Sequence, residues 1–482
     1  PGEITGMSEL RFVIHNRTRM PVIGDEASYL AGPDQTPWPA VWEVRENEVV
    51  LKYDKEDSPK LHQQFISATG EILTLVTSTL KPSGKSGLLW LELTRGIVDR
   101  LRNRVAAWEV NGFQPSASLA ERVEHCAQAF CQAVSVRGDV AACETLCIST
   151  IDTSLEVIDQ AMEEYLVWCS TRETAEDSMS KTLRGAWLGP SELTQPERMD
   201  DLSKILNTVA ISVSWRKIQP TPEEWDWSSL DEQLAKANAY DWNVMLGPLL
   251  QFDRAWLPDW IVESSSDFDE VRTAVQKFII QVVKRCASEV DLCLLANRIN
   301  RGGDTGWPAA SRLQLIVDAA IGLRRVTDQL PFIVGVTQPF SECHAIEDEY
   351  PVLHVADGLL RSNIDLAGFA LEIEFGTEPG QSWPRDACQL MDRIGQWGMF
   401  GLPMVVVTSQ GDPLEEDAMS GSATARLRDF PLWLRQLDNN PGVHAVFWSN
   451  LPKPNQDQEE MAEPPALSIA MDWIRDGFGL SR

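Results

Sequence analysis

From residue 181 onward the sequence alternates short apolar runs with longer amphipathic segments, and this alternation is the strongest constraint on the fold. The eight runs are 185–189, 207–213, 243–250, 291–297, 332–337, 366–375, 403–409 and 443–449. A helix-like segment follows each run, with 266–287 and 464–476 among the clearest. Eight β/α units in about 300 residues fit a closed (β/α)8 TIM barrel better than an open doubly wound sheet. In one of the helices, Ser228 opens a Ser-Ser-Leu-Asp sequence that predicts a capping box.

The first 180 residues follow different patterns. Between residues 8 and 80, β-branched and aromatic runs are separated by turn residues, which predicts strands in a small sandwich-like domain. From residue 86, apolar positions recur at helical spacing and predict three or more amphipathic helices. We therefore expect an α/β protein with a β-rich domain at 1–85, a helical segment at 86–180 and a barrel at 181–482. The β-rich domain could be a carbohydrate-binding module or a sheet packed against its neighbour.

The charge balance restricts the kind of partner. The chain has 71 acidic and 42 basic residues, a net charge of −29. Like charges repel at long range, so nucleic acids and anionic membranes are not expected partners. No apolar run reaches the roughly 18 residues of a membrane span, and no glycine-rich phosphate-binding motif follows a predicted strand. We expect no membrane anchor, no nucleotide and no other cofactor.

The nine cysteines contain no CxxC pair. Cys143 and Cys147 could share a helix face, but two thiols without nearby histidines make a poor zinc site, so no metal is expected. Buried free thiols suit a reducing cytoplasm. The N-terminus has no basic region followed by an apolar core, and the predicted location is therefore cytoplasmic. Residues 1–6 precede Met7 and could be a remnant, which leaves a removed signal open.

Two of the predicted strand ends carry distinctive aromatic motifs. Trp215 is followed by Arg-Lys-Ile-Gln-Pro, the triplet Trp225-Asp226-Trp227 comes before the next helix, and Leu-Pro-Asp-Trp stands at 257–260. This layout resembles the second and third strands of glycoside hydrolase family 10. The resemblance extends over about residues 181–482. It implies a TIM barrel that cleaves β-1,4-linked xylan-type chains internally.

Both catalytic positions implied by this resemblance are changed. In the family the acid/base glutamate follows an asparagine, whereas here Asn297 is followed by Arg298. The nucleophilic glutamate follows a threonine, whereas here Thr408 is followed by Ser409. An arginine keeps its proton at neutral pH, and a serine needs a neighbouring base. The sequence therefore predicts a catalytically inactive pseudoenzyme with a carbohydrate-binding or structural role.

Two other carboxylates leave an alternative open. Glu372 and Glu374 are two residues apart on a predicted strand, so their side chains share a face about 7 Å apart. If that face points into the barrel mouth, these carboxylates could restore hydrolysis and make the protein an active O-glycoside hydrolase on β-linked polysaccharide. Arg298 could instead form a salt bridge with Glu372, or bind an anionic group of a ligand.

The expected partner is a poly- or oligosaccharide, and the candidate ligand-binding residues are Trp215, Asn297, Arg298, Glu372, Glu374 and Trp448. Trp448 could stack on a sugar ring or be an ordinary buried tryptophan. A third hypothesis is a protein-interaction scaffold. In that case the first 180 residues would form a homo-oligomer or bind another protein.

Overall fold

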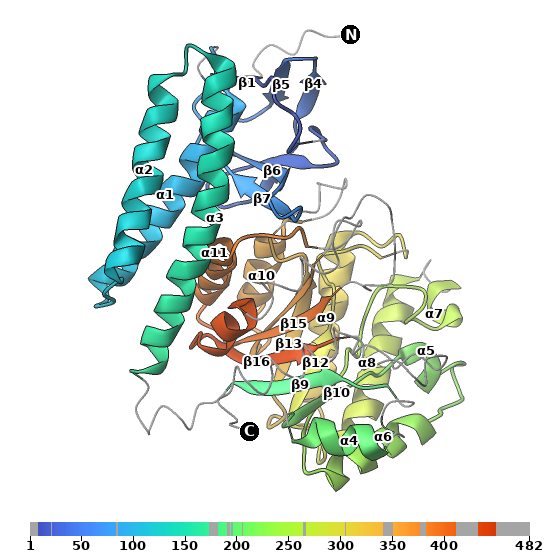
Figure 1. Cartoon of the computed structure of the whole chain (residues 1–482). Coiled ribbons are helices and arrows are strands. Elements are labelled where there is room, and N and C mark those ends of the chain that lie inside the picture. Colours follow the sequence, from blue (N-terminus) through green and yellow to red (C-terminus); the bar gives the residue numbers. More distant parts are fainter. Residues whose placement is uncertain are drawn as a thin grey trace, which may run out of the picture.

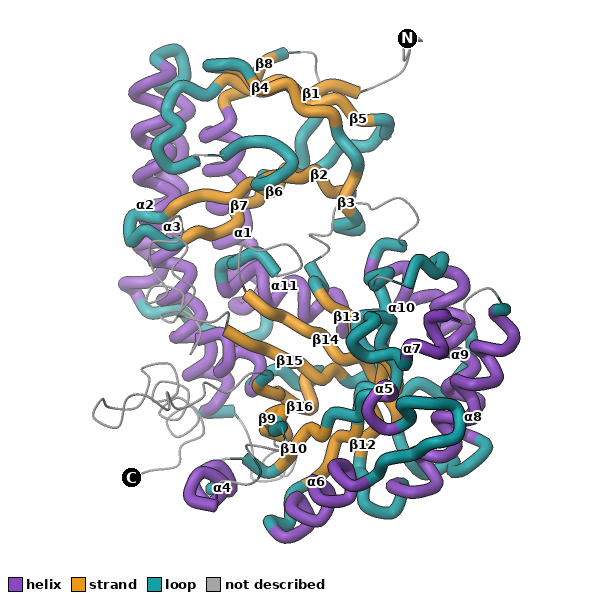
Figure 2. The backbone as a smooth tube through the Cα atoms, turned by 90° about the vertical axis from the view of Figure 1, so that its right-hand side faces the viewer, coloured by secondary structure: helices purple, strands orange, loops and turns teal. Residues whose placement is uncertain are grey.

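A computed structural model of the chain describes residues 8–20, 22–82, 85–172, 182–189, 193, 196–204, 206–263, 267–303, 305–340, 350–375, 382–410 and 432–449. The chain forms two packed bodies. The N-terminal sheets and three long helices lie above and beside the barrel in Figure 1, and Figure 2 shows the same arrangement after a quarter turn.

Eight parallel strands close into a barrel in sequence order, and the last strand pairs with the first. The strands are β9 (Leu183–Trp187), β10 (Thr208–Ile211), β11 (Asn243–Leu246), β12 (Leu292–Ala296), β13 (Phe332–Thr337), β14 (Gly368–Phe375), β15 (Met404–Gln410) and β16 (Val443–Trp448). Each strand overlaps one of the eight apolar runs, and the predicted TIM barrel is confirmed. The strands are almost continuously apolar because parallel strands in a barrel are covered on both faces.

Helices cover the outside of the barrel (Figures 1 and 2). They are α4 (Pro196–Ser203), α5 (Trp215–Ile218), α6 (Ser228–Ala239), α7 (Asp259–Glu263), α8 (Phe268–Cys286), α9 (Ala309–Arg324), α10 (Val352–Arg361) and α11 (Ala387–Gly398), with a further helical stretch at 432–438. The helix predicted at 464–476 lies outside the described residues.

The capping box predicted at Ser228 is wrong. Helix α6 begins at Ser228, its N-cap is Trp227, and no side chain caps it. The carboxylate of Asp226 instead accepts from the Ser228 backbone N–H at 3.0 Å and from its hydroxyl at 2.5 Å. The serine hydroxyl is therefore used in a local turn just before the helix.

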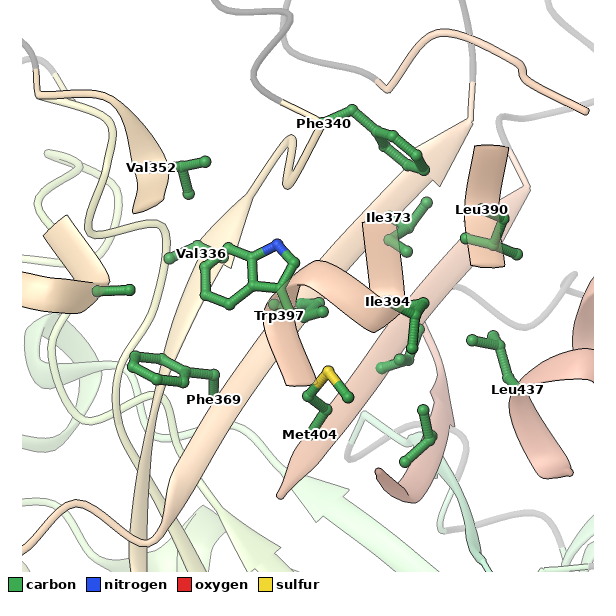
Figure 3. Packing of buried hydrophobic residues seen from close by; sticks show 14 of the residues in the cluster. Val336, Phe340, Val352, Phe369, Ile373, Leu390, Ile394, Trp397, Met404 and Leu437 are labelled. Atoms are coloured by element: carbon green, nitrogen blue, oxygen red, sulfur yellow. The ribbon is translucent and has the colours of Figure 1, made fainter. Parts of the chain in front are cut away.

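Alternate side chains of the barrel strands enter two separate apolar clusters. Figure 3 shows part of the outer one, where Phe369 and Ile373 of β14 lie near Trp397 of α11. The inner cluster fills the barrel with Ala210, Met245, Leu294, Ile333, Ala370, Val405, Val407, Ala445 and Phe447. Since Ala370 points inward, Glu372 and Glu374 also point inward, nearer the carboxyl end of the strand.

Residues 8–88 contain two four-stranded sheets. One has the order β4 (Val41–Val44), β5 (Glu48–Tyr53), β1 (Ser8–Val13), β8 (Ser86–Leu88), and the other β3 (Pro37–Trp38), β2 (Ser28–Ala31), β6 (Lys60–Ile66), β7 (Ile72–Val76). The small β-rich domain expected ahead of the barrel is confirmed. Strand β8 lies where a helix was expected to start. Residues 86–88 pair with β1, and the helix begins only after them, in keeping with the low helix propensity of Gly87.

Three long helices follow these sheets: α1 (Leu89–Val110), α2 (Ala117–Ser135) and α3 (Val140–Ser170). Trp90 and Ile97 of α1 and Ile151 of α3 are fully buried in one core with the sheets. Helix α3 also contacts α11 of the barrel. The apolar faces of this segment are therefore used within the chain, and a protein partner for it stays a prediction. Within the described part of the chain, no helix has the length and apolar character needed to span a membrane.

The sheet that contains β7 packs against the segment leading into α11. The backbone N–H of Thr74 donates to Pro384 O at 2.8 Å, and Arg100 of α1 forms an ion pair with Asp386 at 2.6 Å. The structure shows this sheet packed against its neighbour, and a carbohydrate-binding role for the β-rich domain stays a prediction. This domain therefore borders the barrel beside the carboxyl end of β14.

Candidate functional site

The carboxyl ends of the strands form the functional face of a TIM barrel. In β12 a register shift between Leu294 and Ala296 interrupts the alternation of side chains. Leu294 faces the interior and Ala296 joins the outer cluster. Asn297 then approaches the interior face of β13, where a Cβ on Gly335 would lie only 2.0 Å from Asn297 Oδ1. The bulge thus directs Asn297, which is 9% exposed, into the barrel.

Arg298 and Glu372 form a bidentate ion pair across β13. Arg298 Nε donates to Glu372 Oε2 at 2.8 Å, and Nη2 donates to Oε1 at 2.7 Å. The hydrogen bonds to Glu372 raise the pKa of Arg298 above its ordinary value, and the charges of Glu372, Glu374 and Asp253 act in the same direction. The predicted salt bridge is therefore confirmed. Arg298 has a φ of +52°, a left-handed backbone conformation that is uncommon for a residue with a side chain.

Glu374 lies one step further along the same face of β14. Its side chain is half-buried and makes no hydrogen bond or ion pair with any residue that the structure describes. Its backbone pairs with Ser409 of β15, whose side chain lies outside the described part of the chain. The two glutamates that share a face therefore differ, since Glu372 is held by a cation and Glu374 has no hydrogen-bond or ion-pair partner among the described residues.

Trp187 is a candidate that was not singled out from the sequence. It ends β9, packs beside Phe447 of the inner cluster at 5.8 Å between ring centroids, and is only half-buried. It places an accessible aromatic ring in the barrel mouth. The sequence signal was a tryptophan at the end of the first apolar run, 185–189.

The other two candidate tryptophans lie in the apolar core. Trp215 is fully buried, stacks on Phe278 at 4.6 Å, and donates through Nε1 to Gln219 Oε1 at 2.9 Å. Trp448 is 5% exposed and belongs to the outer cluster, while its neighbour Phe447 faces the interior. Neither ring faces the barrel interior with Arg298.

The described residues contain no group of three His, Cys, Asp or Glu side chains that could hold a metal ion. Cys143 and Cys147 are both buried on α3. Burial raises the pKa of Cys147 to about 12. Because a thiolate and not a thiol binds metal, this pair is poorly suited to the role.

A family model matches part of the barrel. The model of glycoside hydrolase family 42, described as beta-galactosidase, matches residues 194–292. The match runs from just before α4 to the start of β12 and ends before Asn297 and Arg298. It spans less than half of the chain, and no curated protein matches this sequence.

Solved structures similar to this chain include family 10 xylanases. Xylanase 10B from Thermotoga maritima is 14% identical, with 63% of this chain and 98% of that chain covered and a TM-score of 0.48. Xylanase 10B from Thermotoga petrophila RKU-1, solved with xylobiose, is 12% identical, with 62% and 95% covered and a TM-score of 0.47. Xylanase B from Clostridium stercorarium F9 is 15% identical, with 57% and 88% covered and a TM-score of 0.44. At these identities and TM-scores the similarity shows nothing about the activity or the substrate of this chain.

Proposed function

We propose that the carboxyl end of the barrel binds a glycan and does not hydrolyse it. The observation that carries this proposal is the bidentate pair between Arg298 and Glu372. Arg298 stands where the family resemblance implies a proton donor, and an arginine has no proton to give at neutral pH. Glu372 accepts a hydrogen bond on each oxygen. Each oxygen keeps a second lone pair, but the guanidinium offsets the charge of the carboxylate and fixes its orientation, which makes Glu372 a weaker nucleophile.

The alternative, an active hydrolase with relocated carboxylates, needs both Glu372 and Glu374. Side chains two residues apart on a strand are about 7 Å apart, which falls in the range of about 6.5–9.5 Å used by inverting glycosidases. Spacing alone would therefore permit the reaction. The ion pair with Arg298 argues against it, because an inverting enzyme needs one carboxylic acid and one free carboxylate.

Three side chains support a sugar as the ligand. The half-buried ring of Trp187 offers an apolar face of the kind that stacks on sugar rings. Asn297 has an amide donor and acceptor that bond to no described residue. Arg298 has a 40% exposed side chain, and its Nη1 bonds to no described residue, so it can donate to hydroxyl oxygens. The partial match to a family of beta-galactosidases agrees with a sugar ligand.

The test combines binding with a search for products. Calorimetry with β-linked xylo-, cello-, manno- and galacto-oligosaccharides would show whether any of them binds the full chain. The same mixtures, kept for days at high protein concentration, would then be examined by mass spectrometry. We expect binding of at least one oligosaccharide and no shortened product.

Matched variants identify the site. Trp187→Ala should weaken binding about tenfold or more, as expected for loss of an aromatic anchor. Trp42→Ala removes another half-buried tryptophan, from β4 of the N-terminal sheets, and should leave binding unchanged. If only Trp42→Ala lost binding, the glycan site would lie in the β-rich domain and not in the barrel. Product formation that disappears in the Glu372→Gln, Glu374→Gln double variant would overturn the proposal in favour of hydrolysis.

A further inference from the structure

The acidic groups around Arg298 outnumber the cation that they face. Arg298 is paired with Glu372, and both Glu374 and Asp253 also lie close enough to stabilise its charge. Counting these four side chains, one positive charge stands among three negative ones. These four side chains together therefore carry an excess of negative charge.

Glu374 is the centre of this excess charge. Both hydrogen bonds that Arg298 donates to a carboxylate go to Glu372, so Glu374 interacts with the charge of Arg298 only at longer range and forms no ion pair of its own in the described part of the chain. A half-buried carboxylate loses part of its hydration, and a counter-charge offsets that loss. A ligand that brings a positive group next to Glu374 would supply this counter-charge.

A second observation points to a ligand at the same place. The Asn297 side chain is 9% exposed, is directed into the barrel at Gly335, and has no hydrogen-bond partner among the described residues. The Asn297 amide is not one of the fully buried unsatisfied groups of the described residues, so its donor and acceptor are open to water or to a polar group of a ligand. Amide, guanidinium and carboxylate together suit hydroxyl and amino groups on one ligand.

On this basis, and resting on the proposed glycan binding, we propose that the ligand is an amino sugar whose protonated amine binds Glu374. The hydroxyl groups of such a sugar can bond to Asn297 and to the free edge of Arg298. An anionic uronic acid would instead meet repulsion from Glu374 and Asp253. The net charge of −29 further favours a cationic over an anionic ligand at long range.

The test compares tetramers of matched length at pH 6, where the amine is protonated. Glucosamine, N-acetylglucosamine and galacturonic acid tetramers present cationic, neutral and anionic sugars to the full chain. We expect the glucosamine tetramer to bind about tenfold more tightly than its acetylated counterpart, the effect of one charge-assisted hydrogen bond. Added salt should reduce this difference, because it screens a partly exposed pair.

Glu374→Gln should abolish the preference, so that the glucosamine and N-acetylglucosamine tetramers bind this variant equally tightly to within about twofold. Asp253→Asn should also reduce this preference, and this variant provides the test if Glu374→Gln does not fold. Glu109→Gln removes the same charge from an exposed position on α1 and should change nothing. If the neutral or anionic tetramer binds as tightly as the glucosamine tetramer or more tightly, the amino-sugar inference is wrong, while the proposed glycan binding still stands. Binding of no glycan overturns the proposed function as well.

Discussion

Arg385 of the barrel lies against His62 of the N-terminal sheets, with 3.3 Å between Arg385 Nη1 and His62 Nδ1. A guanidinium can only donate, so Nδ1 accepts and the neutral imidazole carries its proton on Nε2. His62 is 4% exposed and stacks on Tyr29 at 4.3 Å, and Arg385 also donates to the Tyr29 hydroxyl at 2.8 Å. A buried polar contact therefore joins the two bodies of the chain.

This contact predicts a loss of stability at acidic pH. Burial, and then the positive charges of Arg385, Arg393, Lys60 and Arg100, lower the pKa of His62 well below 6.5. Below pH 6.5 the unfolded chain binds a proton at this histidine and the folded chain does not, so the free energy of unfolding falls as pH falls. The stabilising effect is fully present above the unfolded pKa.

The variant His62→Phe keeps an aromatic ring on Tyr29 but cannot titrate. Below pH 6.5 the wild type should lose up to about 1.4 kcal/mol per pH unit relative to this variant. Urea unfolding of both proteins at pH 7.5, 6.5 and 5.5 would measure the difference. If the unfolding free energies of the two proteins changed with pH in the same way, His62 would have to bind its proton in the folded chain as well, and the prediction would be wrong.

Removing Arg298 should destabilise the barrel more than removing the whole ion pair. Arg298→Met leaves Glu372, which is 8% exposed, as an unpaired charge. We expect a cost of about 2–3 kcal/mol, toward the low end for a broken buried pair because Arg298 itself is partly exposed. The double variant Arg298→Met, Glu372→Gln should recover part of that loss. Denaturant unfolding of the two variants gives the comparison, and additive effects would argue that the pair does not couple.

Replacing Gly335 should disturb Asn297. The new Cβ of Gly335→Ala would lie 2.0 Å from Asn297 Oδ1, so the amide must move. We expect a loss of about 1–3 kcal/mol in unfolding free energy, together with weaker glycan binding. The control is Gly395→Ala on α11, where the added methyl meets nothing within 4 Å and should stabilise the helix by about 0.5–1 kcal/mol. If Gly335→Ala changed neither the unfolding free energy nor glycan binding, neither property would depend on the position of the Asn297 side chain.

Thiol reactivity should separate Cys131 from the buried cysteines. Cys131 is exposed on α2, whereas Cys147, Cys286 and Cys388 are buried, and burial raises the pKa of each of these three to about 12. The thiolate is the reactive form. In the native protein at pH 8 we expect rapid labelling of Cys131 and slow labelling of the other three.

Peptide mapping by mass spectrometry after timed alkylation would assign each rate. Cys131→Ser should remove the fast reaction at this peptide, and denaturant should make the buried thiols react. Rapid native labelling of Cys147 would contradict the packing of α3 against α1.

Much of the barrel could be predicted from local patterns. The runs at 332–337 and 366–375 became β13 and β14 because apolar, β-branched segments between amphipathic helices have few other ways to be buried. The shared face of Glu372 and Glu374 followed from the two-residue period of a strand. The replacement of two catalytic glutamates by Arg298 and Ser409 rests on the resemblance alone and stays a prediction.

The site was harder to predict, because a single residue step decides which way a strand side chain points. Trp448 and Phe447 are neighbours, yet the first faces the helices and the second the barrel interior. Trp187 faces the interior on β9 and was missed, since a short apolar run does not show which of its faces is inside. The bulge in β12 turned Asn297 inward, and no turn residue in that run marks it.

The sequence by itself determined that the chain forms a barrel behind a β-rich domain, and its resemblance to glycoside hydrolase family 10 implies that Arg298 and Ser409 stand at the two catalytic positions. These properties depend on residue identity and on short periods along the chain. Only the tertiary structure decided that Arg298 forms its ion pair with Glu372, 74 residues away, while Glu374 has no ion-pair partner in the part of the chain that the structure describes. It also decided that His62 meets Arg385, 323 residues away. Such contacts depend on how the closed barrel and the packed domains bring distant residues together, and the local periodicity of the sequence does not encode this.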